Sequence, residues 1–437
     1  MAFHPEVYHL PPSEIIRLQE ELLRELISRV ARTSPFYAER FSRGKVDAAA
    51  VRTMEDLALL PFTSKKDIQE RNQDFWAAPK ERLAEIVATT GTTGEPIYVV
   101  MTAQDLDRLE ESERRGFSWL GAKRGDRFHI AVTLDNLFVA GLAYHLGLHE
   151  IGVATYRVGA QPARRHLDLM KQLRPDGVVA VPSMLLSLAR QARRDGEDLA
   201  AFAPRRAMLI GDSIRDQSLG SNTLGRHLEQ AWGGELFSTY GLTEAGLAFH
   251  ECPRHQGLHA HPDLVVVEVV DDAGRPVPDG ESGELIITTL QVEGTPLLRY
   301  RTGDVTFRVP GACPCGRGGP RIGPILGRKQ HRLKFKGTTL YPKALEDALL
   351  SVDGVENFVI EAHTGDDETD RIVVRVGTLC DDPGFWKTVG ESVYAKARVT
   401  PEICLTSPEA VETLRFKGGR RKPRVFVDFR KPPGGSR

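Results

Sequence analysis

Leucine and isoleucine recur every three to four residues within 13–32, directly after a proline at position 12. The recurring residues are Ile15, Leu18, Leu22 and Leu26. This spacing places them on one face of a helix, and proline is favoured in the first helical turn. We therefore expect an amphipathic surface helix here.

From about residue 83 the pattern changes to short apolar runs that alternate with helical stretches such as 105–120 and 165–173. Strands that alternate with helices predict an α/β fold, with layers and parallel-rich sheets. The strand-like runs are IVATT, IYVVMT, FHIAVTL, GVVAVP, RAMLI and ELFSTYG.

A further change follows near residue 265, where VVVEVVDD, GELIITTL and VTFRV are separated by turns rich in Gly, Pro and Asp. This predicts a β-rich subdomain. Behind GRKQHRL the chain contains a helix, two strands and another helix, which indicates a small α+β unit. We expect a large N-terminal domain over 1–326 and a small C-terminal domain over 327–437.

The net charge of the 437-residue chain limits the classes of partner that it can attract. Its 58 basic and 59 acidic residues nearly cancel. No overall field attracts nucleic acid or an anionic membrane, so a small-molecule partner is expected. No apolar run approaches the roughly 20 residues of a membrane helix. MAFHPEVYHL lacks the layout of a secretory signal, and five cysteines suggest no disulfide framework. These features predict a cytoplasmic protein.

A loop rich in glycine and threonine follows the first strand-like run. Glycine lets backbone N–H groups approach an anion closely, and threonine adds hydroxyl donors, so the loop suits a phosphate. It lacks the lysine of a Walker A motif, which disfavours an ordinary P-loop NTPase. Taken alone, a hairpin turn explains it equally well. Its residues are Thr89, Thr90, Gly91, Thr92, Thr93 and Gly94, followed by Glu95 and Pro96.

Four further segments follow this loop in order: STYGLTE at 238–244, RYRTGD at 299–304, GR at 327–328 and RKPRVFVD at 421–428. Singly, they could be a strand-to-turn junction, a surface turn or a solvated basic tail. With the loop, they resemble the motifs of the adenylate-forming superfamily of acyl-CoA synthetases, luciferases and peptide-synthetase adenylation domains. SPFYAERF, LPFTSKKDI, LFVAGLAYHLG, VPSMLL and GELIITTL resemble the phenylacetate–CoA ligases in particular.

This resemblance implies an acid–thiol ligase that uses ATP to convert an organic carboxylic acid into an acyl-adenylate with release of pyrophosphate. The likeness to phenylacetate–CoA ligases implies that the acid is aromatic. The acyl group then passes to the thiol of CoA. The resemblance also implies ATP, Mg²⁺ and CoA as cofactors, and a mobile C-terminal domain that rotates between the two steps. Because two anions must meet in the first step, positioning and charge neutralisation dominate the catalysis.

Several residues receive nucleotide-binding roles from the same resemblance. Tyr240 would stack on adenine, Thr243 would reach the α-phosphate, and Glu244 would bind Mg²⁺. The 89–94 loop would hold the departing phosphates. The other members of this predicted set are Gly211, Asp212 and Ser213 at the adenine-contacting turn, and Gly241.

The later motifs supply the rest of the predicted site. Asp304 and Arg328 would hold the ribose. Lys422 would be the catalytic lysine that bridges the carboxylate and the α-phosphorus, since its offset from Asp428 resembles the spacing in the family, whereas Lys417 lies too far upstream. The backbone near Lys336 and Gly337 would line the passage for the thiol of CoA.

The predicted acid pocket differs from that of the phenylacetate enzymes. Phe138 matches an aromatic wall, but Thr133 takes the place of a tyrosine, and Asp135 and Asn136 lie beside it. Such a pocket favours a more polar acid than phenylacetate, for example a hydroxylated or amino-substituted one.

Two departures from the family pattern keep other functions open. Glu95 replaces a lysine and adds negative charge near the triphosphate, and Gln330 occupies the hinge position that normally holds Asp or Lys. A catalytically retired relative that binds a nucleotide is therefore an alternative. A second alternative, which the motifs hardly separate from transfer to CoA, is an adenylating enzyme that transfers the acyl group to a carrier protein or an amine. The sequence allows a monomer or a homodimer.

Three cysteines and one histidine form a candidate metal site: Cys252, His259, Cys313 and Cys315. Three thiolates and an imidazole are a typical tetrahedral set for structural zinc. Some phenylacetate–CoA ligase-like proteins share this arrangement. The C-x-C spacing is shorter than usual, and unligated packing is the alternative, as free cysteines are commonly buried. His255 and His261 could compete for the ligand role.

Overall fold

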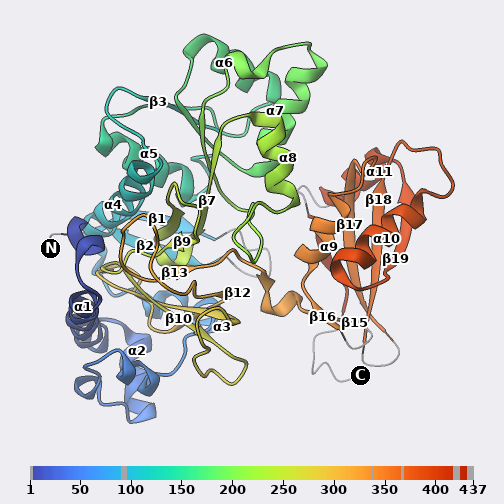
Figure 1. Ribbon diagram of the computed structural model, residues 1–437. Coiled ribbons are helices and arrows are strands. Elements are labelled where there is room, and N and C mark those ends of the chain that lie inside the picture. Colours follow the sequence, from blue (N-terminus) through green and yellow to red (C-terminus); the bar gives the residue numbers. More distant parts are fainter. Residues whose placement is uncertain (1–2, 90–95, 336–337, 366–368, 417–423, 431–437) are drawn as a thin grey trace. The chain divides into compact units, whose positions relative to one another are not determined.

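The computed structural model describes residues 3–89, 96–335, 338–365, 369–416 and 424–430 (Figure 1). The chain divides into two compact units. The first unit comprises Met1–Ser221, Gly225–Thr302 and Thr306–Ile325, and the second comprises Asn222–Leu224, Gly303–Val305 and Leu326–Arg437. Among the described residues, no helix combines the length and the apolar character that crossing a membrane requires.

Helix α1 (Pro12–Thr33) confirms the amphipathic helix that the periodicity predicts. Ile15, Leu22 and Leu26 are buried on its inner face, and Leu18 is half-buried. The short elements that follow or precede it are η1 (Pro5–His9), α2 (Pro35–Gly44), η2 (Ala48–Ala50), η3 (Glu55–Leu59), α3 (Lys65–Glu70), η4 (Asn72–Phe75) and η5 (Lys80–Arg82).

Strands β1 (Leu83–Ala88) and β2 (Tyr98–Thr102) form a separate antiparallel pair. The sequence groups these two runs with the parallel-rich layers, but they pair with each other instead. The intervening residues 89–97 are too few for a crossover connection, which takes a dozen residues or more between parallel strands. The glycine- and threonine-rich loop therefore connects the strands of a hairpin.

An eight-stranded sheet forms the centre of the first unit, in the order β13-β9-β8-β7-β6-β5-β3-β4. Its parallel half confirms the predicted α/β class and consists of β3 (Arg127–Ile130), β4 (Ala154–Arg157), β5 (Gly177–Ala180), β6 (Arg206–Leu209) and β7 (Glu235–Leu242). Its antiparallel half continues from β7 with β8 (Leu247–Glu251), β9 (Leu258–His259) and β13 (Arg321–Ile322).

The helices between these strands are α4 (Ala103–Trp119), α5 (Val139–Ile151), α6 (Ala163–Leu173), α7 (Pro182–Arg194), η6 (Leu199–Ala201) and α8 (Thr223–Trp232). Helix α4 lies close against β8, because a Cβ atom on Gly116 would come within 2.2 Å of the His250 ring. Only glycine permits this approach.

The predicted β-rich subdomain corresponds to a four-stranded sheet in the order β10-β11-β12-β14. Its strands are β10 (Val265–Val270), β11 (Ser282–Thr289), β12 (Tyr300–Phe307) and β14 (Gly327–Arg328). β10 and β11 pair antiparallel from Val265 opposite Thr289 to Val270 opposite Glu284. Short turns connect antiparallel strands, which is why the turn-rich sequence here predicts a β structure.

The second unit is an α+β structure around a mixed sheet in the order β19-β18-β17-β20. The sequence predicts α9, β17, β18 and α10, while the hairpin β15–β16, the edge strands and α11 are additional. The elements are η8 (Lys329–His331), β15 (Leu333–Phe335), β16 (Thr338–Leu340), α9 (Pro342–Leu349), β17 (Asn357–Thr364), β18 (Asp370–Gly377), α10 (Phe385–Ala397), β19 (Glu402–Thr406), α11 (Pro408–Arg415) and β20 (Phe426–Asp428).

Candidate active site and metal centre

The predicted adenine residues lie where two neighbouring parallel strands end. Strand β6 ends just before the Gly211-Asp212-Ser213 turn, and the last residues of β7 include Tyr240 and Gly241. Open α/β sheets bind ligands at the carboxyl ends of their strands. Gly211, Asp212 and Gly241 are exposed there, and Ser213 and Tyr240 are half-buried. We call this part of the molecule the nucleotide edge.

Glu244 lies in the short turn η7 (Thr243–Ala245), which connects β7 to β8. The Tyr300 hydroxyl donates a hydrogen bond to Glu244 Oε1 at 3.3 Å, and Tyr300 is only 1% exposed. This contact joins the STYGLTE and RYRTGD segments, which lie far apart in the sequence. The sequence gives Tyr300 no role, although it stands inside the RYRTGD segment.

A buried arginine on α4 holds the same turn from behind. Arg108 donates to the carbonyl oxygens of Ala245 and Gly246, both at 2.9 Å, and to those of Leu290 and Leu264 at 2.9 and 2.6 Å. Burial lowers the pKa of Arg108 to about 10. These four acceptors satisfy the guanidinium and fix the backbone that follows Glu244.

Asp304 and Arg328, the two predicted ribose residues, face each other across paired strands. They are register partners between β12 and β14, and Arg328 Nε lies 3.3 Å from Asp304 Oδ1. Asp304 is 4% exposed, whereas nearly half of the Arg328 side chain is exposed. The structure therefore pairs the GR segment at 327–328 with the RYRTGD segment at 299–304.

The predicted acid residues form a tight loop after β3, between Thr133 and Phe138, which caps α5. Thr133 donates a short hydrogen bond to Asp135. Asn136 and Leu137 both have left-handed backbone conformations, with φ of 61° and 59°. Such conformations are strained for residues other than glycine and cluster at functional sites.

This loop also lies next to the start of the predicted phosphate loop. The Ala88 amide at the end of β1 donates to the Leu137 carbonyl oxygen at 2.9 Å. Thr89 follows and closes the β1–β2 hairpin, because its amide donates to Ile97 O at 3.0 Å and its hydroxyl accepts from Ile97 N at 3.1 Å. A hairpin turn and a phosphate loop are thus compatible interpretations of one segment.

Some predicted site residues lie outside the described residues. They are Thr90, Gly91, Thr92, Thr93 and Gly94 of the phosphate loop, Lys336 and Gly337 of the CoA passage, and Lys422. Further along the chain, Arg430 donates to the carbonyl oxygens of Gln330 and Arg332 at 3.1 and 2.8 Å. The C-terminal segment therefore binds directly to the predicted hinge within the second unit.

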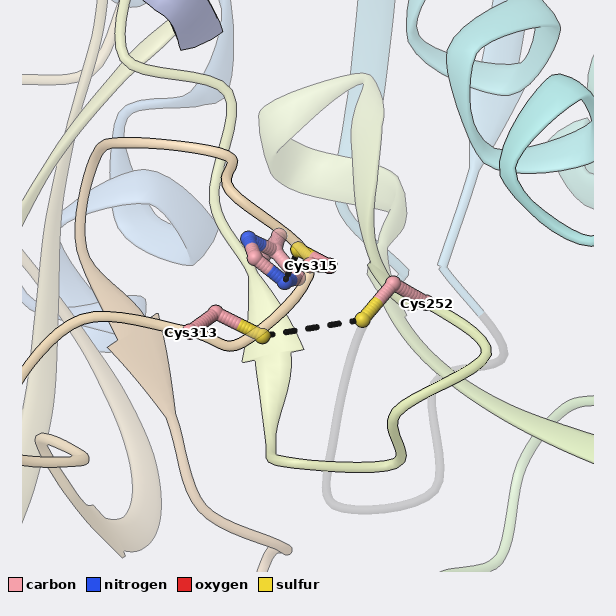
Figure 2. Close-up of side chains that lie close together, drawn as sticks. Cys252, Cys313 and Cys315 are labelled. Carbon is pink, nitrogen blue, oxygen red and sulfur yellow. Dashed lines mark hydrogen bonds between the residues drawn. The ribbon is translucent and has the colours of Figure 1, made fainter.

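The four candidate metal ligands come together in the first unit, and Figure 2 shows the three sulfur atoms turned toward a common centre. Cys252 Sγ and Cys313 Sγ are 3.7 Å apart, and Cys315 Sγ is 3.6 Å from His259 Nε2. All four ligand atoms lie within 4.8 Å of one another. A sulfur separation of 3.7 Å excludes a disulfide bond, which needs about 2.05 Å.

Burial shapes the chemistry of this metal cluster. It raises the pKa of Cys252 to about 12 and lowers the pKa of His259 to about 3, so the imidazole is neutral and can act as a ligand. His255 and His261 bind elsewhere. The His255 Nδ1 lies 2.9 Å from Arg215 Nη2, and the His261 ring bonds to Tyr8 and His250.

Comparison with known proteins identifies the family of this chain. The family model of AMP-binding enzymes matches residues 23–293. A phenylacetate–coenzyme A ligase of Thermus thermophilus is 34% identical over 360 residues, which cover 81% of this chain and 79% of the relative. The chain belongs to the AMP-binding enzyme family. A phenylacetate–coenzyme A ligase of Escherichia coli K12 is 28% identical, with 78% of this chain and 77% of the relative covered.

The fold of this AMP-binding enzyme also occurs in solved structures. A 2-hydroxyisobutyryl-CoA ligase in complex with its acyl-adenylate superposes with a TM-score of 0.85 at 19% identity, covering 97% of this chain and 91% of the other. An anthranilate CoA ligase gives a TM-score of 0.58 at 16% identity, covering 76% and 65%. The predicted family, the α/β fold and the class of AMP-forming acid–CoA ligases are therefore confirmed.

Proposed function

We propose that this AMP-binding enzyme activates an aromatic or related polar carboxylic acid and transfers the acyl group to CoA. The nucleotide edge carries this proposal, because the described members of two predicted nucleotide motifs meet at the ends of β6 and β7. The first step forms a bond between a carboxylate oxygen and the α-phosphorus of ATP, and pyrophosphate leaves. In the second step the thiol sulfur attacks the acyl carbon, the thiol proton is lost, and AMP leaves.

The predicted nucleotide-binding residues and Lys422 act in the adenylation step of this proposal. Tyr240 and the 211–213 turn hold adenine, Thr243 positions the α-phosphate, and Asp304 with Arg328 holds the ribose. The Thr89–Gly94 loop binds the departing phosphates, and Lys422 neutralises charge between the two anions. The carboxylate of Glu244 is a suitable hard ligand for Mg²⁺, which supplies charge neutralisation at the α-phosphate when bound.

The acid specificity is proposed from the loop after β3. Thr133, Asp135 and Asn136 supply polar side chains in the loop that ends at the half-buried Phe138. Such a lining favours a hydroxylated or amino-substituted acid over phenylacetate, because a polar substituent replaces the water that these groups lose. A panel of acids in which unsubstituted phenylacetate reacts fastest would contradict this part of the proposal.

We propose zinc for the metal cluster of Cys252, His259, Cys313 and Cys315. Ligand distances of about 2.3 Å for sulfur and 2.0–2.1 Å for nitrogen place two sulfur atoms about 3.8 Å apart in a tetrahedron, and sulfur and nitrogen about 3.5 Å apart. The separations of 3.7 and 3.6 Å fit these values. Because protein atoms fill all four positions, the role is structural and not catalytic.

The domain roles and the location of the protein are part of the same proposal. Residues 1–326 bind ATP and the acid, and residues 327–437 form the mobile domain with Lys422. In the thioester step, the backbone at Lys336 and Gly337 lines the path of the CoA thiol. The near-neutral charge is compatible with a cytoplasmic enzyme that acts on small molecules, either as a monomer or as a homodimer.

Acid-dependent exchange of pyrophosphate into ATP tests the first step. We expect Lys422→Ala to lower the exchange rate by about 10²-fold or more, since it removes a charge from the reacting centre. Lys417→Ala is the matched control and should retain the rate within about threefold. Equal losses in the two variants would contradict the assignment of Lys422, and no exchange with any acid in the unmodified protein would favour a retired relative.

The acceptor needs its own assay. Incubation of the unmodified enzyme with ATP, a reactive acid and CoA should yield the acyl-CoA thioester. A carrier protein or an amine, offered in parallel, should give less product. A product on the carrier protein or the amine with none on CoA would favour the alternative function, which the sequence motifs do not separate from transfer to CoA.

A further inference from the structure

A buried ion pair connects the nucleotide edge to the metal cluster. Arg215 Nε donates to Glu251 Oε1 at 3.0 Å, and Nη2 donates to Oε2 at 3.2 Å. The two side chains are 9% and 1% exposed. Neither residue belongs to a predicted motif, and the proposed reaction uses neither. Arg215 follows β6 and Glu251 ends β8, so the pair joins the two sides of β7.

On the side of the nucleotide edge, the ion pair holds the backbone of β7 and of the adenine-contacting turn. Arg215 Nη2 also donates to the Leu236 carbonyl oxygen at 2.9 Å, and Glu251 Oε2 accepts from the Ser238 amide at 2.9 Å. Both contacts hold the part of β7 that leads to Tyr240. The Ser213 hydroxyl donates to the Arg215 carbonyl oxygen at 3.1 Å, which ties the adenine-contacting turn to the same arginine.

On the other side, the ion pair contacts the segment that carries the metal ligands. Glu251 is covalently followed by Cys252, and the His255 Nδ1 lies 2.9 Å from Arg215 Nη2. The same Nδ1 lies 3.0 Å from Glu251 Oε2, so the His255 ring contacts both members of the ion pair. Arg215 therefore orients the turn between Cys252 and His259 as well as the nucleotide edge.

We propose that Arg215 and Glu251 are positioning residues that couple the metal cluster to nucleotide binding. This inference rests on the proposed function and deepens it, because it names how the metal cluster acts on the active site. The planar fork of arginine serves Glu251, Leu236 and His255 at once, and a lysine ammonium cannot reproduce that geometry. Loss of the pair shifts β7 and the adenine turn, and weakens binding of the nucleotide.

The principal test compares Arg215→Lys with Arg206→Lys. Arg206 is the first residue of β6 and pairs with Asp126 at 2.8 Å, so the control alters a partly buried arginine ion pair at the opposite end of the same strand. We expect Arg215→Lys to weaken AMP binding in calorimetry by about tenfold and to raise KM for ATP similarly, with kcat nearly unchanged. Arg206→Lys should lower the melting temperature without changing either constant.

The double variant Arg215→Met/Glu251→Met keeps the test decisive if the single variant folds poorly. Apolar residues often replace a buried ion pair without loss of stability. The double variant should melt near the unmodified protein and still bind AMP about tenfold more weakly. Unchanged AMP affinity in both variants, with an unmodified enzyme that binds AMP and exchanges pyrophosphate, would overturn the inference. Absence of AMP binding and exchange in the unmodified enzyme would instead overturn the proposed function.

The coupling itself is tested by removal of the metal. A chelator should weaken AMP binding severalfold in the unmodified protein but have a smaller effect in Arg215→Lys, because the connecting contacts are already lost. Equal effects of the chelator on both proteins would show that the ion pair does not transmit the influence of the metal.

Discussion

The two halves of the eight-stranded sheet place their functional groups in opposite ways. The parallel half exposes short turns at the ends of β6 and β7, where Gly211, Asp212 and Gly241 are open to solvent. The antiparallel half encloses Cys252, His259 and Cys313 among buried residues. An edge that exchanges substrates must be open, whereas a site that holds a structural ion must be closed. Under the proposed function, the open half of this sheet holds the catalytic groups and the closed half holds the stabilising metal.

The largest effect is expected at the open edge. Glu244→Gln removes the proposed anionic ligand for Mg²⁺ and should lower the exchange rate by about 10²-fold. Its melting temperature should change little, because Glu244 is half-buried in a short surface turn. Tyr300→Phe is the matched control, since it removes the hydrogen bond to Glu244 but keeps the carboxylate, and should cost less activity. Nearly normal exchange in Glu244→Gln would break the division between the halves.

The closed half should respond in stability. Cys313→Ser should abolish stoichiometric zinc in elemental measurements and cost roughly 3 kcal/mol of unfolding free energy, as loss of a metal is among the most destabilising changes. At saturating ATP, kcat should stay within about threefold. Cys404→Ser, a half-buried cysteine of the second unit, is the control and should retain the metal. A zinc-free protein of normal stability would remove the structural role.

Two buried histidines sharpen the comparison through pH. Burial lowers the pKa of both His129, in the parallel half, and His259 to about 3. His129 Nε2 bonds to His166 Nδ1 at 2.7 Å, and its ring lies against Tyr156. His129 binds a proton more tightly in the unfolded chain than in the folded one. Its neutral ring therefore contributes its full stabilisation above pH 6.5, and this contribution declines as the pH falls toward 3.

Lowering the pH from 7 to 5 should therefore reduce the unfolding free energy by about 2 kcal/mol through His129 alone. Denaturant unfolding at the two pH values measures it. His129→Phe should reduce the pH dependence, and the exposed His149→Gln should not. Identical pH dependence in all three proteins would show that the His129–His166 pair is not the acid-sensitive element of the parallel half.

The sequence predicts the elements whose signal is local. The leucine spacing of 13–32 predicts α1, the β-branched run GVVAVP predicts β5, and the run ELFSTYG predicts β7, whose last residues include Tyr240. Strand β4 (Ala154–Arg157) has four residues of mixed polarity, so no periodicity distinguishes it from a loop.

Residues that only the fold brings into contact are harder to predict from the sequence. The ligand set of Cys252, His259, Cys313 and Cys315 is predictable because thiols and imidazoles have few alternative uses in such a pattern. Arg215 and Glu251 are ordinary surface residue types, and only the pairing of β6, β7 and β8 buries them together. Buried charge pairs therefore have to be found in the structure.

The smallest effect is expected in the acid loop of the parallel half, at Leu137. Its side chain is 46% exposed and its φ is 59°, so glycine relieves backbone strain and loses little packing. Leu137→Gly should raise the unfolding free energy by up to about 1 kcal/mol, offset in part by the greater freedom of glycine in the unfolded chain. Leu137→Ala removes the side chain but keeps the strain, and should give no such gain. If the glycine variant also reacts with a broader range of acids, the strained conformation serves selectivity at the open edge; unchanged acid preference would confine it to local structure.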